Sequence, residues 1–268
     1  MLPYVTLPVI HVAGPIDIQP FGLLVVTAIF VGTALARWRA PRLDIGRDEL
    51  DSFFTWMLVG GFVGAHVLQI VFYHPEKILS DPLSLLRLWE GISSFGGIIG
   101  GMIGFLLWKR FRGGGQSVFA HADLVASVFP VAWIFGRAGC SVAHDHPGRL
   151  AESGELLAAL AVQYPASTGR LAGLRYDLGL LEMFFSILLS VGLLFAWRKP
   201  RPVGTYLAIV CLTYAPVRFY MDFLRIAEPD GGDLRWLSLT FAQWSCVVVA
   251  GYGVYLVTRL RRTAAQAA

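Results

Sequence analysis

Long uninterrupted runs of apolar residues dominate this sequence of 268 residues. An apolar stretch of about 20 residues is long enough to cross a lipid bilayer as a helix. A membrane β-barrel is disfavoured, because its strands would be segments of about 10 residues with alternating polarity. We therefore expect an all-α integral membrane protein whose single domain covers residues 1–268. Its seven predicted transmembrane helices lie at residues 20–38, 52–73, 93–109, 119–141, 178–197, 204–224 and 236–258.

The composition agrees with a membrane protein and disagrees with a soluble one. Hydrophobic residues make up 56% of the chain and charged residues only 15%. Soluble domains carry about 25% charged residues. A chain this poor in charge has too little polar surface to remain in water as a soluble domain.

The basic residues are not distributed as they would be for nucleic-acid binding. Thirteen of the 22 lysines and arginines follow the first, third, fifth and seventh predicted spans, which end on one side of the membrane if the helices alternate in direction. The positive-inside rule makes that side cytoplasmic. We therefore expect the N-terminus to lie outside, in the periplasm, and the C-terminus to lie in the cytoplasm. The basic residues concerned are Arg37, Arg39, Arg42, Arg47, Lys109, Arg110, Arg112, Arg198, Lys199, Arg201, Arg259, Arg261 and Arg262.

Two further features concern the organisation of the chain. The connection 142–177 contains the stretch ESGELLAALAVQYP, which predicts a short helix and a strand in a small periplasmic subdomain. Glycines recur at small-xxx-small spacing in the second span (Gly60 and Gly64) and in the third, between Gly96 and Gly104. This spacing is typical of closely packed membrane helices, and the alternative is that bare backbone leaves room for a lipid headgroup or acyl chain.

Ionisable side chains inside a bilayer are costly and therefore mark functional sites. Arg137 lies late in the fourth span, Glu182 early in the fifth, and Arg218 and Asp222 late in the sixth. With the expected topology, all four fall near the outer leaflet. Four such groups on three helices at one depth predict a polar site there.

The sixth span ends in the sequence RFYMDFLR, which places Arg218, Asp222 and Arg225 at i, i+4 and i+7 on one helical face. One interpretation is an intrahelical ion pair that only neutralises charge. The other is a guanidinium held by a carboxylate so that it binds phosphate, for which arginine is well suited. Both stay open at this point.

A polar stretch, FGRAGCSVAHDHPGR, follows directly from the fourth span. It places His144, Asp145 and His146 at the outer interface, where a histidine oriented by a carboxylate is a natural proton acceptor. The alternatives are an interfacial polar turn before Pro147-Gly148 and a metal site, for which this spacing alone is weak evidence. We expect no metal and no cofactor.

Several blocks of the sequence together resemble the prolipoprotein diacylglyceryl transferase family, over nearly the whole chain. They are GPIDIQPFGLL, AHVLQIVFYHPEKILSDPLSLLRLWEGISSFGGIIGG, ADLVASVFPVAWIFGRAGCSVAHDHPGR and RFYMDFLR…WLSLTFAQW. The resemblance implies transfer of the diacylglyceryl group of phosphatidylglycerol to the lipobox cysteine thiol of a prolipoprotein. A thioether forms and glycerol phosphate leaves. Membrane lipid and the prolipoprotein signal peptide are the implied partners, with no nucleic acid, and the bacterial inner membrane is the implied location.

The resemblance also assigns residues to the implied reaction. Arg137 and Arg218 match family arginines and are expected to bind the lipid phosphate. Other retained positions are expected to line the headgroup site with Asp222 and Arg225. They are Gly139, Gly148, Arg149, Glu182 and Gln243.

This chain departs from the family pattern at six positions, one of which is Phe21, where the family usually has a tyrosine. Phe95 stands where the family has a histidine, Cys140 and Ala143 replace two asparagines, and Asp145 and Asp222 replace glutamates. His144, His146 or His66 is then expected to supply the base, with Asp145 orienting the imidazole. The alternatives are a paralogue with another phospholipid-dependent transfer activity and a non-catalytic lipid-binding protein. A transporter is disfavoured, because the charges cluster at one depth and we find no repeated halves.

Overall fold

The computed structural model describes residues 1–268 except 14–15, 88–90, 92, 114–116, 227–234 and 268. The chain divides into two compact units, one formed by Arg37–His121 and the other by Met1–Ala36 with Ala122–Ala268. That all spans form one domain stays a prediction.

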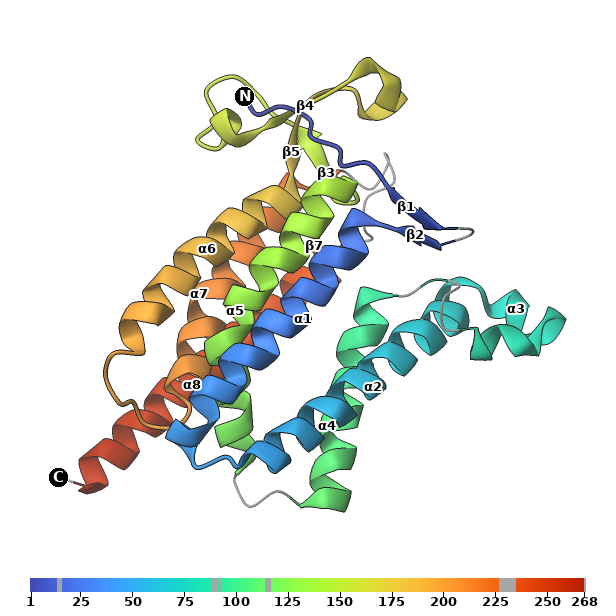
Figure 1. The fold of residues 1–268 in the computed structure, drawn as a ribbon. Coiled ribbons are helices and arrows are strands. Elements are labelled where there is room, and N and C mark those ends of the chain that lie inside the picture. The colour runs from blue at the N-terminus through green and yellow to red at the C-terminus, as the bar shows by residue number, and fades with distance from the viewer. Residues whose placement is uncertain (14–15, 88–90, 92, 114–116, 227–234, 268) are drawn as a thin grey trace. The chain divides into compact units, whose positions relative to one another are not determined.

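Each of the seven predicted spans corresponds to a helix (Figure 1). Six of the described helices are long and apolar enough to cross a membrane. The seventh, α4, is not among those six, because its glycines and the basic residues of its last turn lower its mean hydropathy. The helices are α1 (Pro20–Arg39), α2 (Arg47–Tyr73), α4 (Ser94–Arg112), α5 (Val118–Ala143), α6 (Leu178–Ala196), α7 (Thr205–Met221) and α8 (Phe241–Ala267).

The unit Arg37–His121 is built on α2 and α4, which pack against each other, with the short helix α3 (Pro75–Ser80) after α2. The packing is tight because glycine backbones lie in the contact. A Cβ added to Gly64 would lie 2.6 Å from the Cα of Gly100, and one added to Gly60 would lie 2.5 Å from the Gly100 carbonyl oxygen. The predicted close helix packing is therefore confirmed. An apolar groove of about 620 Å³ also lies along these two helices.

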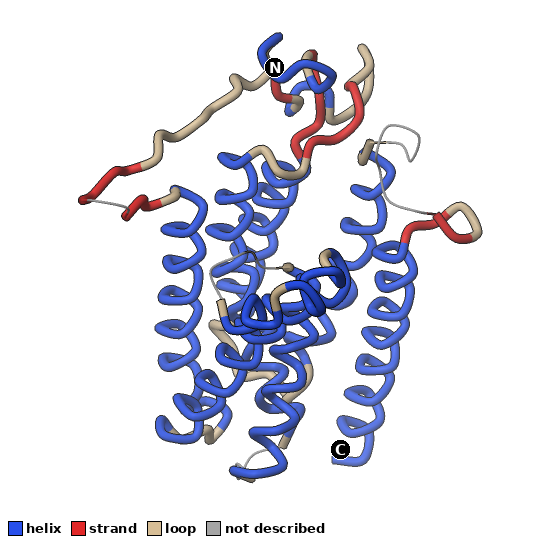
Figure 2. The backbone as a smooth tube through the Cα atoms, turned by 90° about the vertical axis from the view of Figure 1, so that its right-hand side faces the viewer, coloured by secondary structure: helices blue, strands red, loops and turns tan. Residues whose placement is uncertain are grey.

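The other unit contains α1, α5, α6, α7 and α8, with its strands at one end of the helices (Figures 1 and 2). The sequence of α6 shows why it packs as it does: Leu178, Glu182, Ser186, Leu189 and Leu193 recur at helical spacing, and all are buried. α7 packs against both α6 and α8.

The connection between α5 and α6 folds into a three-stranded antiparallel sheet with the order β3-β5-β4. The predicted strand is confirmed as β4 (Val162–Tyr164), but the predicted short helix is only a 3₁₀ turn at Ala158–Leu160. The helix prediction was wrong because Gly154 adopts φ +95° just before this segment and the residues after it pair with β5. The other strands of this unit are β1 (Ile10–Ala13), β2 (Ile16–Ile18), β3 (Pro147–Leu150), β5 (Gly173–Asp177), β6 (Arg235–Trp236) and β7 (Leu239–Thr240).

The sheet is fixed to the helices and to the N-terminus. Tyr176 and Ala161 pack in one buried cluster with Leu181 of α6 and Leu224 after α7. Leu2 hydrogen-bonds to this subdomain through its backbone, donating to Ala161 and accepting from Gln163. The end of the helix bundle is therefore covered by an ordered cap, which positions the residues that leave α5 and enter α6.

Candidate active site

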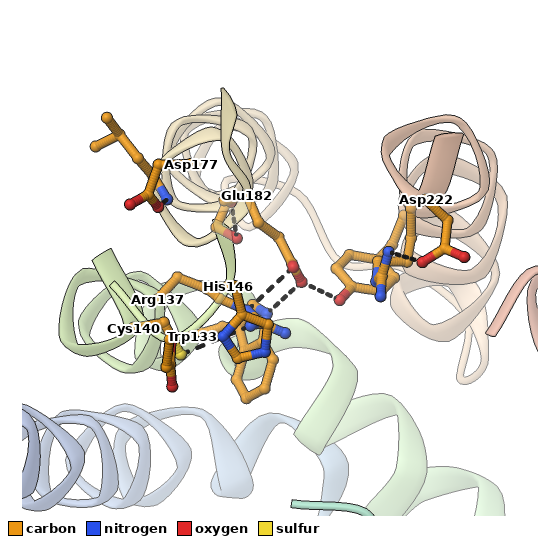
Figure 3. A network of polar contacts seen from close by, with 12 residues as sticks. Trp133, Arg137, Cys140, His146, Asp177, Glu182 and Asp222 are labelled. Carbon is orange, nitrogen blue, oxygen red and sulfur yellow. Dashed lines mark hydrogen bonds and ion pairs between the residues drawn. The ribbon is translucent and has the colours of Figure 1, made fainter. Parts of the chain in front are cut away.

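A buried carboxylate, Glu182, joins three helices. Its side chain accepts hydrogen bonds from the indole of Trp133, at 2.9 Å, and from the Tyr214 hydroxyl. It also forms an ion pair with Arg137, whose Nε lies 3.1 Å from the Glu182 Oε2 (Figure 3). Arg137 and Glu182, which the sequence assigns to one polar site, are therefore in direct contact.

Arg137 is held on several sides. Its guanidinium lies over the Trp133 ring, 4.5 Å from the ring centroid, in a cation–π arrangement. Its NH1 lies 3.7 Å from the sulfur of Cys140, one helical turn further along α5. Since only 13% of the side chain is exposed, the orientation of this guanidinium is largely set by the protein.

A second buried carboxylate, Asp222, forms ion pairs with two arginines. Arg218 NH1 lies 2.9 Å from Asp222 Oδ1, and Arg225 NH1 lies 3.6 Å from the same oxygen. The hydroxyl of Thr240 donates to the other oxygen. The three residues do meet, but not on one α-helical face, because α7 ends at Met221 and Arg225 is extended after a 3₁₀ turn.

Tyr214 connects Glu182 to α7, the helix that also carries Arg218. It bonds to Glu182 and lies four residues before Arg218, hence on the same face of α7. Figure 3 shows the Glu182 and Asp222 centres in one view, contributed by α5, α6, α7 and the segment after α7.

His146 lies at the C-terminal end of α5, beside Asp145 and Cys140. Its Nδ1 lies 2.5 Å from Asp145 Oδ1, and 32% of its side chain is exposed. The hydrogen bond to Asp145, with a further one to Cys140, raises the pKa of His146 to about 9. At this pKa the imidazole is matched to a thiol, whose ordinary pKa is about 8.5, for exchange of a proton.

His144 is placed differently, and Asp145 does not contact it in the described hydrogen bonds. Its Nδ1 lies 3.0 Å from the carboxylate of Asp177, and its Nε2 lies 3.0 Å from the carbonyl oxygen of Val5. The ring also stacks on Tyr4 at 3.7 Å. Both ring nitrogens therefore face acceptor oxygens. His144 in this arrangement fastens the N-terminal segment to the end of α5.

The contacts of Gln243 and Gly139 give each residue a structural role. Gln243 is fully buried, and its amide accepts from the Thr240 backbone N–H at 3.0 Å and donates to the Phe219 carbonyl at 3.3 Å. It therefore ties the start of α8 to α7 next to Asp222. A Cβ on Gly139 would lie 3.0 Å from the Phe21 ring, so this glycine allows α5 to approach α1.

Gly148 lets β3 approach the residues that follow α7. A Cβ there would lie 2.6 Å from the Leu224 carbonyl oxygen, and Gly148 forms a β-bridge with Arg225. The next residue, Arg149, forms an ion pair with Glu155. Hydrogen bonds from Arg149, from the Glu152 backbone and from Tyr176 lower the pKa of Glu155 to about 2.

Two residues singled out in the sequence lie in the other unit. His66 is fully buried, with its Nδ1 3.1 Å from the Gly91 carbonyl oxygen and its Nε2 2.9 Å from that of Ser84. It therefore holds the segment between α2 and α4. The side chain of Phe95 lies outside the described residues.

Three residues of the site were not predicted from the sequence: Trp133, Tyr214 and Thr240. Trp133 and Tyr214 each lie four residues before a predicted arginine, so helical spacing was an available signal. Thr240 lies 18 residues from Asp222, and no spacing in the sequence connects them.

Comparison with known proteins decides the family. Residues 8–259 match the prolipoprotein diacylglyceryl transferase family. The chain belongs to this family. The resemblance seen in the sequence is therefore confirmed, over almost the full length of the chain.

Several relatives carry the name phosphatidylglycerol–prolipoprotein diacylglyceryl transferase. The protein from Ectopseudomonas mendocina is 29% identical over 96% of this chain and 95% of its own length. The protein from Polynucleobacter asymbioticus is 32% identical over 92% of this chain and 93% of its own. The protein from Chromohalobacter salexigens is 30% identical over 95% and 92%.

Proposed function

We propose that this chain transfers the diacylglyceryl group of phosphatidylglycerol to the lipobox cysteine thiol of prolipoproteins. Membership of the transferase family over residues 8–259 carries this proposal. In the reaction, a C–S bond forms to the glyceryl carbon, the C–O bond to phosphate breaks, and glycerol phosphate leaves with the electron pair. The protein must bind an anion and accept the thiol proton.

Arg137 and Arg218 are proposed to bind the phosphate. Each is oriented by a buried carboxylate, Glu182 or Asp222, so that the guanidinium groups are fixed before lipid binds. With Arg225, the three arginines of this cluster outnumber its two buried carboxylates, Glu182 and Asp222, by one. Preorganised donors of this kind stabilise the charge that develops on the leaving group.

His146 is the proposed base for the thiol, with Asp145 as its orienting partner. It is the histidine that contacts Asp145, and part of its ring is exposed. His144 is less suited, because both of its nitrogens face acceptors. The thiol must become thiolate to attack, since the thiolate is the nucleophilic form.

The proposed membrane arrangement has seven spans, including α4, in the bacterial inner membrane. The N-terminus and the β3-β5-β4 sheet lie on the periplasmic side and the C-terminus in the cytoplasm. Support comes from the basic residues that follow the first, third, fifth and seventh spans. The glycine contact of α4 with α2 also fits two helices paired inside a bilayer.

The proposal is tested by transfer from labelled phosphatidylglycerol to a peptide that carries a lipobox cysteine. The purified chain is expected to form a thioether on the peptide and to release glycerol phosphate. If labelled lipid is consumed without modification of the peptide, the alternative of another phospholipid-dependent transfer replaces it. Cys140, Ala143 and Asp145, which replace family asparagines and a glutamate, are the residues that favour this alternative.

Variants of the arginines and of His146, with an exposed arginine as the control, test the proposed roles in phosphate binding and proton transfer. Arg137→Gln and Arg218→Gln are each expected to lower kcat by about a hundredfold, the usual effect of removing one preorganised donor, whereas Arg170→Gln in an exposed turn is expected to have no effect. His146→Ala is expected to abolish most of the transfer at neutral pH. Full transfer by His146→Ala would rule out His146 as the base.

A further inference from the structure

A cluster of three metal-binding residue types lies at the C-terminal end of α5. The thiol of Cys140, the carboxylate of Asp145 and the imidazole of His146 each place a ligand atom within 4.8 Å of the other two. The spacing of the histidines in the sequence gave only weak evidence for a metal. The structure adds Cys140, which lies in the last turn of the helix while the other two follow it.

We propose that Cys140, Asp145 and His146 bind a thiophilic divalent cation such as Zn²⁺. Cysteine, histidine and aspartate are all ligands of Zn²⁺, with bond lengths of about 2.3 Å to sulfur and about 2.0 Å to nitrogen or oxygen. Three protein ligands leave the fourth tetrahedral position for water or substrate. His146 Nδ1 and Asp145 Oδ1 lie 2.5 Å apart in a hydrogen bond, which the cation replaces when both groups bind it.

The charges of the cluster suit a divalent cation. A cysteine thiolate and an aspartate carboxylate carry two negative charges, and neutral His146 adds none. Arg137 NH1 lies 3.7 Å from the sulfur, but its charge is balanced by Glu182 at 3.1 Å. Thiolate coordination favours Zn²⁺ over Mg²⁺ or Ca²⁺, which prefer oxygen ligands.

The proposed metal site is accessible to solvent, whereas the other two cysteines of the chain are buried. Cys140 is half-buried, whereas Cys211 and Cys246 are buried. His146 and Asp145 are 32% and 41% exposed, so an ion reaches them without unfolding. Cys211 and Cys246 therefore serve as matched controls.

Binding of the cation has a consequence for the proposed transfer. A metal on His146 occupies the lone pair that would accept the thiol proton. The cation therefore inhibits transfer, and a chelator restores it. This consequence depends on the proposed function, whereas the binding itself does not.

Cobalt spectroscopy of the full chain in detergent tests the site without any lipid turnover. The metal-free protein is titrated with Co²⁺, and a thiolate-to-cobalt charge-transfer band is expected to saturate at one equivalent. Zn²⁺ is expected to displace the cobalt, and Mg²⁺ at the same concentration is expected to leave the band unchanged. Cys140→Ser is expected to lose the band and to bind Zn²⁺ at least tenfold more weakly. Cys211→Ser and Cys246→Ser are expected to keep both.

Three results would overturn the proposal. They are the absence of a thiolate band in the wild type, a band that persists in Cys140→Ser, and Zn²⁺ affinity that is unchanged in His146→Ala. The melting temperatures of the metal-free variants show whether each still folds. A wild type that binds Zn²⁺ but transfers no lipid supports the site and counts only against the proposed function.

Discussion

The side chains of this site depend on partners that hold them in place. Thr240 contacts neither arginine in the described bonds, yet its hydroxyl donates to the carboxylate that holds Arg218 and accepts from the Gln243 backbone N–H at 3.2 Å. It therefore positions Asp222 and caps the start of α8. The charged residues were recognisable in the sequence because charge is rare in a membrane span. A threonine at a helix start carries no such signal.

Removing the Thr240 hydroxyl is expected to misplace Arg218. Thr240→Val leaves an oxygen of buried Asp222 without its donor, and we expect kcat for diacylglyceryl transfer to fall about tenfold, or about 1.4 kcal/mol in activation free energy. Thr240→Ser keeps the hydroxyl and is expected to restore the rate. If Thr240→Val lowers only the melting temperature and the rate per folded protein is unchanged, Thr240 has no positioning role.

At the scale of elements, the glycines decide how closely helices approach. The small-xxx-small pattern predicted tight packing, but the partner of Gly64, namely Gly100 on α4, is visible only in the structure. The pattern is local, whereas the pairing of two helices depends on which faces meet.

Gly64→Ala is expected to destabilise the α2–α4 pair by about 1–3 kcal/mol, because the new methyl group overlaps the α4 backbone. Gly192→Ala in α6, where a Cβ meets nothing within 4 Å, is the control and is expected to be neutral or slightly stabilising. The measurement is the melting temperature in detergent. Equal melting temperatures for the two variants would contradict the tight contact.

An ion pair between Arg149 of β3 and Glu155, in the connection after β3, responds to acid. The pKa of Glu155 is lowered to about 2 from an ordinary value near 4.5, so its stabilising effect is complete above about pH 4.5 and is lost as the pH falls towards 2. Glu155→Gln is therefore expected to lower the melting temperature at pH 7 and to flatten its decline between pH 5 and pH 3. A variant that declines as steeply as the wild type in acid would show that other groups control this response.

For the whole molecule, the distribution of arginine and lysine predicts the orientation. The C-terminal helix α8 carries Arg259, Arg261 and Arg262 in its last turns. A fluorescent protein fused after residue 268 is expected to be fluorescent in the cytoplasm, and alkaline phosphatase fused there is expected to be inactive. The reverse result would invert the proposed topology and place the site on the cytoplasmic side.

The sequence by itself determined the helices, because six of the seven are long apolar runs whose length and composition satisfy a purely local requirement of the bilayer. It also determined the family and identified Arg137, Glu182, Arg218 and Asp222 as a polar set. Only the tertiary structure decided that His146, and not His144, contacts Asp145. It alone brought Thr240 to Asp222, and Cys140 to His146. The Thr240 and Cys140 contacts join residues from different elements, so they depend on how helices and loops pack. The choice between the two histidines depends on distant partners, because His144 is turned towards Asp177 and Val5.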